Sequence, residues 1–157
     1  MPTLAKTAFA AIVLLVAICA NAQSSVDFSG HWRQNPSSAL QRQLEIEQNG
    51  QNLLVRTILT NSEGTRHLEV KYQIGGPETS YTGLDGDEFH TTVHWDGSTL
   101  VFDTMERENG KDIPQKTVWT LSADGNTLQV DRTSQKSGKP VQSVMTYVRQ
   151  APSQSPK

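Results

Sequence analysis

The sequence has little of what reactive or metal-binding sites are usually built from. Its 157 residues include one cysteine, Cys19, and four histidines. A single cysteine cannot form an intrachain disulfide, and Cys19 lies in a leader that we expect to be removed. No serine lies in the Gly-x-Ser-x-Gly motif of hydrolases. We therefore predict no enzymatic activity, no catalytic residues, no metal site and no cofactor.

A strong excess of one charge is also missing. The chain carries 14 Lys and Arg against 16 Asp and Glu, and the two signs are interspersed. Nucleic-acid partners and anionic membranes are bound by basic clusters, which this sequence does not have. We predict neither a nucleic-acid partner nor membrane insertion of the mature chain, and the sequence indicates no particular protein partner.

The one long hydrophobic run lies at residues 8–20. Lys6 precedes it and the small residues Ala-Asn-Ala follow it at 20–22. This order is typical of a secretory signal peptide, so we expect residues 1–22 to be cleaved after Ala22 and the protein to be secreted or periplasmic. A retained anchor is the first alternative, although the run is shorter than the roughly 20 residues that span a bilayer. A lipoprotein at Cys19 is the second, although the residue before it, Ile18, is not small.

No segment of the mature chain has a helical hydrophobic stripe, and strict alternation recurs instead. In residues 67–74 every second side chain is apolar, which is the period of a strand with one buried face. We predict ten strands, of which the fifth is the weakest in pattern: 28–34, 42–48, 52–60, 66–74, 79–84, 88–95, 99–107, 115–122, 126–134 and 141–149.

Three Asn-Gly or Asp-Gly pairs, at 49–50, 96–97 and 124–125, each come shortly before a strand with a Leu-x-apolar pattern. Such pairs favour tight type I′ hairpins. Placing each pair at the centre of its turn sets Ile46 opposite Leu53, Val93 opposite Leu100 and Leu121 opposite Leu128, apolar against apolar every time.

Short connections throughout make the strands an antiparallel meander, and closing a long meander removes its exposed edges. We predict an all-β fold, a single up-and-down antiparallel barrel of about 8–10 strands over residues 23–149. The Pro/Ser/Gln-rich tail 150–157 is expected to be disordered. The three tight turns fall at one end, which we expect to be closed, and the longer links fall at the other, the mouth.

Residues 28–32, "FSGHW", resemble the Gly-x-Trp signature of the calycins, the superfamily of lipocalins, fatty-acid-binding proteins and avidins. The "DFSGxW" start also resembles that of small secreted bacterial proteins of unknown function. In calycins the Trp packs at the closed end under an Arg from the last strand, and Trp32 and Arg149 match these structural roles. Fatty-acid-binding proteins carry Arg-x-Tyr on the last strand, whereas this chain has Tyr147-Val148-Arg149, and the segment 36–41 is too short for their helical lid.

The inward-facing positions predict where a ligand would lie. Their parity places apolar side chains along most of the barrel, with two arginines, Arg42 and Arg132, near the mouth. A charge in an apolar interior is costly unless it is paired or wet. Each arginine is therefore either an anchor for a ligand's carboxylate or phosphate, or a rim charge in water or paired with a residue such as Glu106. The predicted ligand-binding residues are Arg42, Tyr72, Phe102, Trp119, Arg132 and Tyr147.

We expect the histidines and the acidic run 85–88 to lie on the surface of the barrel. His90 and His94 are four residues apart, which on a strand separates them by roughly 13 Å, and all four histidines have outward parity. We expect His90 to form a surface ion pair with Asp103. The acidic run lacks the ligand-rich loop of an EF-hand.

Two functions from different classes fit these features. The first is a secreted binding or carrier barrel for an apolar or amphipathic small molecule, which predicts an internal cavity of a few hundred cubic ångströms. The second is a protein-interaction module such as a periplasmic protease inhibitor, which predicts a filled barrel and a protruding apolar segment at 22–28.

Overall fold

The structure is a computed structural model, and it describes residues 26–151. The predicted leader, 1–22, and residues 152–157 of the predicted tail lie outside the described residues. Gln150, expected in the tail, instead ends the last strand.

The described chain is built of strands, which confirms the predicted all-β class. They are β1 (Gly30–Gln34), β2 (Gln41–Asn49), β3 (Asn52–Asn61), β4 (Gly64–Gln73), β5 (Thr79–Thr82), β6 (Glu88–Asp96), β7 (Thr99–Glu108), β8 (Lys111–Leu121), β9 (Thr127–Ser134) and β10 (Val141–Gln150), with a 3-10 turn, η1, at Lys136–Gly138. The weakly patterned fifth strand exists but has only four residues. Between β1 and β2 the described chain forms bends and no helix. No helix in residues 26–151 has the length and hydropathy to cross a membrane.

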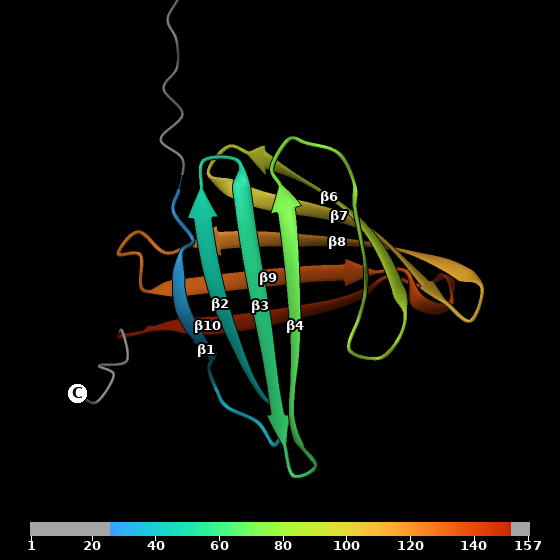
Figure 1. Cartoon of the computed structure of the whole chain (residues 1–157), viewed down its shortest axis with the longest axis horizontal. Helices are drawn as coiled ribbons and strands as arrows, with labels where there is room; N and C mark the ends of the chain where they lie inside the picture. Colours follow the sequence, from blue (N-terminus) through green and yellow to red (C-terminus); the bar gives the residue numbers. More distant parts are fainter. Residues whose placement is uncertain (1–25, 152–157) are drawn as a thin grey trace, which may run out of the picture.

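The strands form one antiparallel meander that curls back on itself. The sheet order is β4-β3-β2-β1-β10-β9-β8-β7-β6-β5. In Figure 1, β2–β4 run steeply while β8–β10 run roughly horizontally across the picture, so the two halves of the sheet cross. The predicted closing pair is confirmed, since β1 pairs with β10 and sets Trp32 opposite Arg149.

The barrel is nearly rather than fully closed, because β4 and β5 are both edges of the sheet. The chain turns away after β4 through Gly75, Gly76 and Pro77, and short β5 pairs only with β6. One bridge links Ile74 to Val93, where the Gly75 N–H donates to the Val93 carbonyl over 2.7 Å. Elsewhere in the seam, the gap between the edge strands β4 and β5, side chains close the wall of the barrel.

The predicted register is confirmed at the third tight turn and wrong by two residues at the other two. Leu121 pairs with Leu128 as expected, whereas Ile46 pairs with Val55 and Val93 with Phe102. The reason lies in the turns: Gly50 and Gly97, at φ +59° and +60°, are the first of two loop residues, and the residues after them do not have positive φ. This is the pattern of type II′ turns rather than type I′. A two-residue shift keeps every side chain on its predicted face.

The closed end is filled by a segment that we had considered as a protruding partner-binding element. Phe28 is fully buried, with its ring centroid 6.0 Å from that of Trp95 and 5.8 Å from that of Trp119. The Gln48 side chain holds the segment, accepting from the Phe28 N–H and donating to the Val26 carbonyl, both over 3.0 Å. Val26 and Phe28 therefore pack against the barrel core, which contradicts the predicted protrusion for the described part of the segment, while residues 22–25 lie outside the described residues.

Trp32 and Arg149 complete this plug. Trp32 is 1% exposed, and the centre of the Arg149 guanidinium lies 4.2 Å from the centroid of its ring. Arg149 also donates to the carbonyls of Gly125, over 2.8 Å, and of Ser29. Gly30 has φ +140°, and a Cβ there would lie 2.5 Å from Arg149 Nη1. Glycine therefore lets the arginine cross over the tryptophan.

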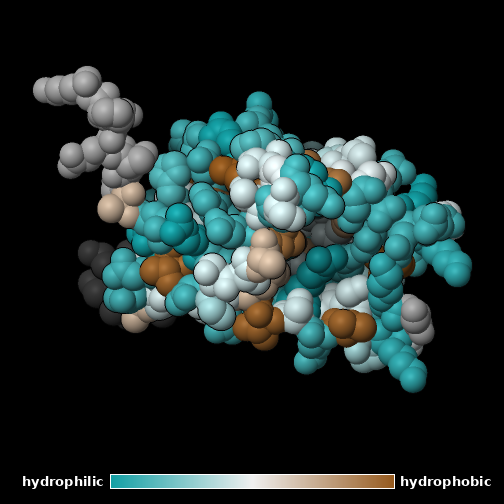
Figure 2. Space-filling model, turned by 90° about the horizontal axis from the view of Figure 1, so that it is seen from below, coloured by the Kyte–Doolittle hydropathy of each residue, from teal (hydrophilic) through white to brown (hydrophobic). Residues whose placement is uncertain are grey.

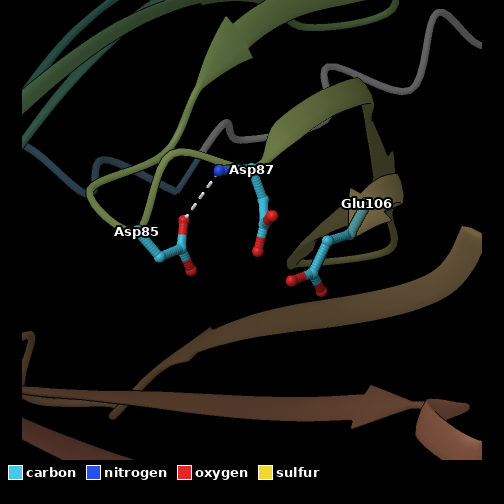
Figure 3. A group of neighbouring side chains, drawn as sticks. All are labelled: Asp85, Asp87 and Glu106. Carbon is cyan, nitrogen blue, oxygen red and sulfur yellow. Dashed lines mark hydrogen bonds between the residues drawn. The ribbon is translucent and has the colours of Figure 1, made fainter. Parts of the chain in front are cut away.

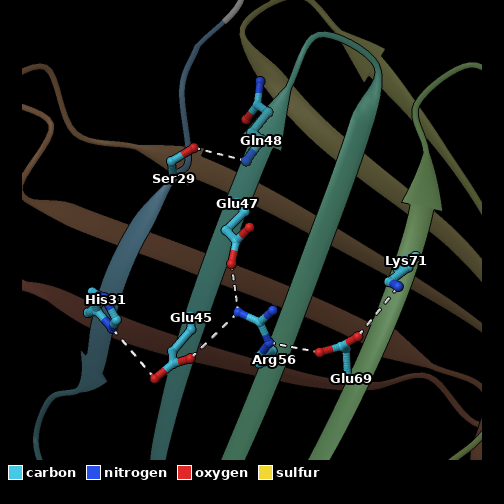
Figure 4. A network of polar contacts seen from close by, with 8 residues as sticks. All are labelled: Ser29, His31, Glu45, Glu47, Gln48, Arg56, Glu69 and Lys71. Atoms are coloured by element: carbon cyan, nitrogen blue, oxygen red, sulfur yellow. Dashed lines mark hydrogen bonds and ion pairs between the residues drawn. The ribbon is translucent and has the colours of Figure 1, made fainter.

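The outer surface is polar, and ion pairs between side chains connect neighbouring strands. Arg56 on β3 reaches Glu47 on β2 at 2.6 Å and Glu69 on β4 at 2.8 Å, so it bridges three strands (Figure 4). Its guanidinium lowers the pKa of the Glu69 carboxyl. Seen from below, apolar residues form separate spots among hydrophilic ones (Figure 2), so this face shows no continuous apolar surface of the kind that docks a protein partner.

The expected ion pair between His90 and Asp103 is wrong. His90 lies 3.0 Å from Glu78 and 3.3 Å from Glu88, while Asp103 lies 3.5 Å from His94. The cause is the two-residue shift between β6 and β7, which sets His90 opposite Met105.

Candidate ligand-binding cavity

The barrel is hollow above the plug. A cavity of about 280 Å³ opens toward the end that carries the longer links, near the segment 83–85 between β5 and β6. All six predicted ligand-binding residues line it: Arg42, Tyr72, Phe102, Trp119, Arg132 and Tyr147. Their role in binding stays a prediction, but the alternation of the strands places each of them at the same hollow.

Aromatic rings form one wall of the cavity and close the seam between β4 and β5. The centroid of the Tyr72 ring on β4 lies 6.1 Å from that of Tyr81 on β5 and 5.5 Å from that of Phe102 on β7. Tyr81 in turn stacks on Phe89 at 5.3 Å, and Phe102 lies 4.7 Å from Trp119. Burial raises the pKa of Tyr72 well above its usual value. This wall is therefore aromatic and uncharged.

Sequence reasoning missed part of this wall. Tyr81 and Leu84 line the cavity together with Phe89. Alternation places Phe89 on the same face as Val93 and Trp95, but residues 79–87 are Gly-rich and weakly alternating, so Tyr81 and Leu84 could not be assigned to a face. An aromatic at 81, two residues before a glycine that makes room for Phe89, was the available signal. A Cβ on Gly83 would collide with the Phe89 ring.

Arg42 enters the cavity from β2 without an acidic partner. Its Nε is buried and has no hydrogen-bond partner among the residues described. Its Nη1 donates to the soft Met145 sulfur over 3.4 Å, and its guanidinium also interacts with the Tyr147 hydroxyl. Within residues 26–151 no carboxylate oxygen lies within 4.0 Å of the Arg42 guanidinium. The Tyr147 hydroxyl points to the same sulfur at 3.7 Å. Burial raises the pKa of Tyr147, and the Arg42 charge opposes that shift.

Arg132 enters from β9 and does have an acidic partner. Its Nη2 lies 3.8 Å from an oxygen of Glu106. Pairing with Glu106 is the alternative to ligand binding that the sequence leaves open for this arginine. Glu106 is 6% exposed and accepts a hydrogen bond from the Gln115 side-chain amide. Burial raises the pKa of Glu106, and Arg132 and then Lys136 oppose that rise. The two inward arginines therefore differ in charge balance.

Two acidic side chains of the loop between β5 and β6 lie beside Glu106. Oxygen atoms of Asp85, Asp87 and Glu106 lie within 4.8 Å of one another, and the Asp85 carboxylate accepts from the Asp87 N–H over 3.3 Å (Figure 3). The carboxylates alone do not establish a metal site, because Glu106 is already bound by Gln115. They do make this part of the rim acidic.

Comparison with known proteins adds two findings. No protein-family model matches the chain. Among curated proteins, the retinol-binding protein 1 of Rattus norvegicus and that of Homo sapiens are each 25% identical over 127 residues, covering 68% of this chain and 87% of theirs.

Solved structures agree more fully in architecture. The fatty acid transporter REP1-NXSQ superposes with a TM-score of 0.63 at 16% identity, covering 80% of this chain and 97% of its own. Human cRBP IV gives 0.57 at 19% identity, covering 80% and 99%. Secretory abundant heat soluble protein 4 from Ramazzottius varieornatus gives 0.63 at 15% identity, covering 79% and 95%. The chain has a calycin fold.

The barrel departs from the fatty-acid-binding pattern in the way that the sequence indicated. Arg149 belongs to the plug and lies outside the cavity lining. The position two residues before Tyr147, where the Arg-x-Tyr motif has arginine, is Met145. Arg42 from β2 reaches that methionine instead, so the cavity keeps a guanidinium beside the tyrosine but takes it from another strand.

Proposed function

We propose that the protein binds a small amphipathic anion, with the apolar part of the ligand in the barrel cavity and its head group on Arg42. The observation that carries this proposal is the unpartnered Arg42 Nε in a cavity lined mainly by aromatic and aliphatic side chains. The proteins named above as similar in sequence or in structure include a retinol-binding protein and a fatty acid transporter, which supports a hydrophobic ligand.

Electrostatics favours an anionic head group over a neutral one. A buried donor that lacks an acceptor costs about 1–3 kcal/mol, and a carboxylate, sulfonate or phosphate oxygen would accept from Arg42 with a charge-assisted bond. The uncharged aromatic wall suits an apolar chain, and the Tyr147 hydroxyl adds a second polar group near the arginine.

The test is a titration followed by tryptophan emission, because Trp119 lines the cavity. Dodecanoate should bind saturably, and dodecanol, which has the same chain without the charge, should bind about tenfold to a hundredfold more weakly. Arg42→Met should bring the two affinities together. The matched control is Arg107→Met, because Arg107 is half exposed and pairs with Asp112 on the outer surface.

Two results would contradict the proposal. One is the absence of saturable binding of either ligand. The other is an Arg42→Met variant that still prefers dodecanoate over dodecanol as strongly as the wild type does.

We also propose that the protein acts after export, as a secreted or periplasmic carrier. The support is the order of charge, apolar run and small residues in 1–22. Expression of the full chain in a bacterial host, followed by fractionation and N-terminal sequencing, should give a periplasmic chain that begins at Gln23. A cytoplasmic chain that still begins at Met1 would contradict export and leave the cavity proposal untouched.

A further inference from the structure

The two inward arginines of the cavity differ in whether an acidic side chain lies beside them. Arg42 has no acidic partner within the described residues, whereas Arg132, whose side chain is 39% exposed, lies 3.8 Å from the nearly buried carboxylate of Glu106. Both line the same hollow. As long as Glu106 is ionised, only Arg42 offers the cavity an uncompensated positive charge.

The surroundings of Glu106 determine how firmly it holds its charge. On its own strand, β7, the neighbouring acid Glu108 is bound by Lys136 of η1 at 2.8 Å. From β8, Gln115 donates a hydrogen bond to Glu106. From β9, Arg132 faces it. From the loop between β5 and β6, Asp85 and Asp87 bring carboxylate oxygens within 4.8 Å (Figure 3).

This environment opposes ionisation more than it favours it. Burial disfavours a carboxylate, and two further carboxylates close by disfavour it again. Arg132 and Lys136 act in the opposite direction, yet the pKa of Glu106 remains raised above its usual value. Proton uptake by Glu106 leaves the bond from Gln115 intact, because a carboxylic acid keeps an accepting carbonyl oxygen.

We propose that Arg132 is a conditional second anion-binding residue of the cavity, neutralised by Glu106 at neutral pH and released when Glu106 takes up a proton. The inference rests on the proposed function, since it concerns the same cavity. The affinity for an anionic amphiphile should then increase as the pH falls, while the affinity for a neutral amphiphile stays constant. Arg42 acts at every pH, and Arg132 adds to it only in mild acid.

The probe for this device must keep its own charge over the pH range. Dodecyl sulfonate does so, whereas a fatty acid would itself titrate. Wild type should bind dodecyl sulfonate about threefold to tenfold more tightly at the acidic end of a pH titration, where Glu106 is protonated, than at the end where Glu106 is ionised. The affinity for dodecanol, measured in parallel, should be the same at both pH values.

Variants separate charge from shape. Glu106→Gln mimics the protonated acid and can still accept from Gln115, so at neutral pH it should already bind the sulfonate as tightly as wild type does in acid. Arg132→Gln should abolish both the pH dependence and the gain from Glu106→Gln. Glu108→Gln is the matched control on the same strand and should leave the pH dependence as in wild type. Far-ultraviolet circular dichroism and the unfolding midpoint check that each variant is folded.

The possible failures are distinguishable. Saturable binding that is independent of pH and unchanged in Glu106→Gln would overturn the conditional role of Arg132 and leave the proposed function standing. A pH effect of equal size for dodecanol would also overturn it, because a change of shape would then be the cause. Absence of saturable binding in wild type at both pH values would overturn the inference together with the proposed function.

Discussion

The inward arginines at the two ends of the barrel differ in their partners. At the closed end, Arg149 stacks on Trp32 at 4.2 Å and donates to two carbonyls, of Gly125 and Ser29. At the open end, Arg42 keeps a buried Nε with no partner among the residues described. A guanidinium whose donors are satisfied within the fold stabilises it, whereas one left short of acceptors costs stability and remains available to a ligand.

The same contrast holds for the aromatic rings. At the closed end, Phe28 packs against Trp95 and Trp119, and its carbonyl accepts from the Trp32 indole N–H over 3.0 Å. Nearer the mouth, Tyr72 and Phe102 line a cavity of about 280 Å³. Substitutions in the plug should therefore change stability, and substitutions around the cavity should change binding.

Removing the plug tryptophan should have the largest effect. Trp32→Ala leaves a cavity at a position that is 1% exposed, so the free energy of unfolding should fall by about 3–5 kcal/mol. Chemical denaturation followed by circular dichroism measures this loss. Val144→Ala is the control, because Val144 is 64% exposed and its truncation should change little. A loss no greater than that of the control would remove Trp32 from the core.

Removing the Arg149 charge that lies over the Trp32 ring should lower the free energy of unfolding by a smaller amount. Arg149→Met keeps an unbranched chain over the indole but leaves the carbonyls of Gly125 and Ser29 without their donor. We expect a loss of about 2–3 kcal/mol in the same denaturation experiment. Arg107→Met, on the outer surface, should leave the midpoint close to that of wild type. Equal midpoints for the two variants would show that Arg149 is not part of the plug.

The glycine of the Gly-x-Trp signature should contribute a smaller amount. Gly30→Ala forces a side chain into positive φ and against Arg149, which should cost about 1–3 kcal/mol. Gly110→Ala is a matched control, because Gly110 also has positive φ, +76°, but a Cβ there would meet nothing within 4 Å. The difference between the two losses measures the clash with Arg149, and its absence would mean that the arginine moves aside freely.

The pH dependence of stability should show the smallest effect. Because the pKa of Glu106 is raised in the folded state, folded protein binds this proton more tightly than unfolded protein does. Its contribution to stability is therefore present in acid and is lost as the pH rises through the folded pKa. Glu106→Gln has no such proton, so the unfolding free energy of the variant relative to wild type should increase from mildly acidic to neutral pH. A relative stability that stays constant or falls would contradict the raised pKa.

Alternation along the strands predicts which side chains face the barrel interior, but it does not determine the register between strands. Because the side-chain period is two residues, parity placed Arg42, Arg132 and Glu106 on the inner face, but it could not tell Ile46 opposite Leu53 from Ile46 opposite Val55. Both registers pair apolar side chains, and only the turn type separates them.

Contacts made by weakly patterned segments could not be predicted from the sequence for a different reason. The burial of Phe28 beneath the barrel depends on the Gln48 side chain, a contact between segments that alternation does not relate. The open seam beside β4 depends on how the Gly75-Gly76-Pro77 turn leaves the sheet. The Trp32–Arg149 contact, in contrast, was expected from the resemblance to calycins and is present.

The most direct test of the account is denaturation of Arg42→Met with and without saturating dodecanoate. Without ligand, the variant should be at least as stable as wild type, because it no longer buries an unpartnered donor. Ligand at a hundred times its Kd should stabilise wild type by about 2.7 kcal/mol, and the variant at the same ligand concentration should lose most of that gain. An unliganded variant as destabilised as Arg149→Met, and stabilised by dodecanoate as much as wild type, would contradict the division between a plug that holds the barrel and a cavity that binds.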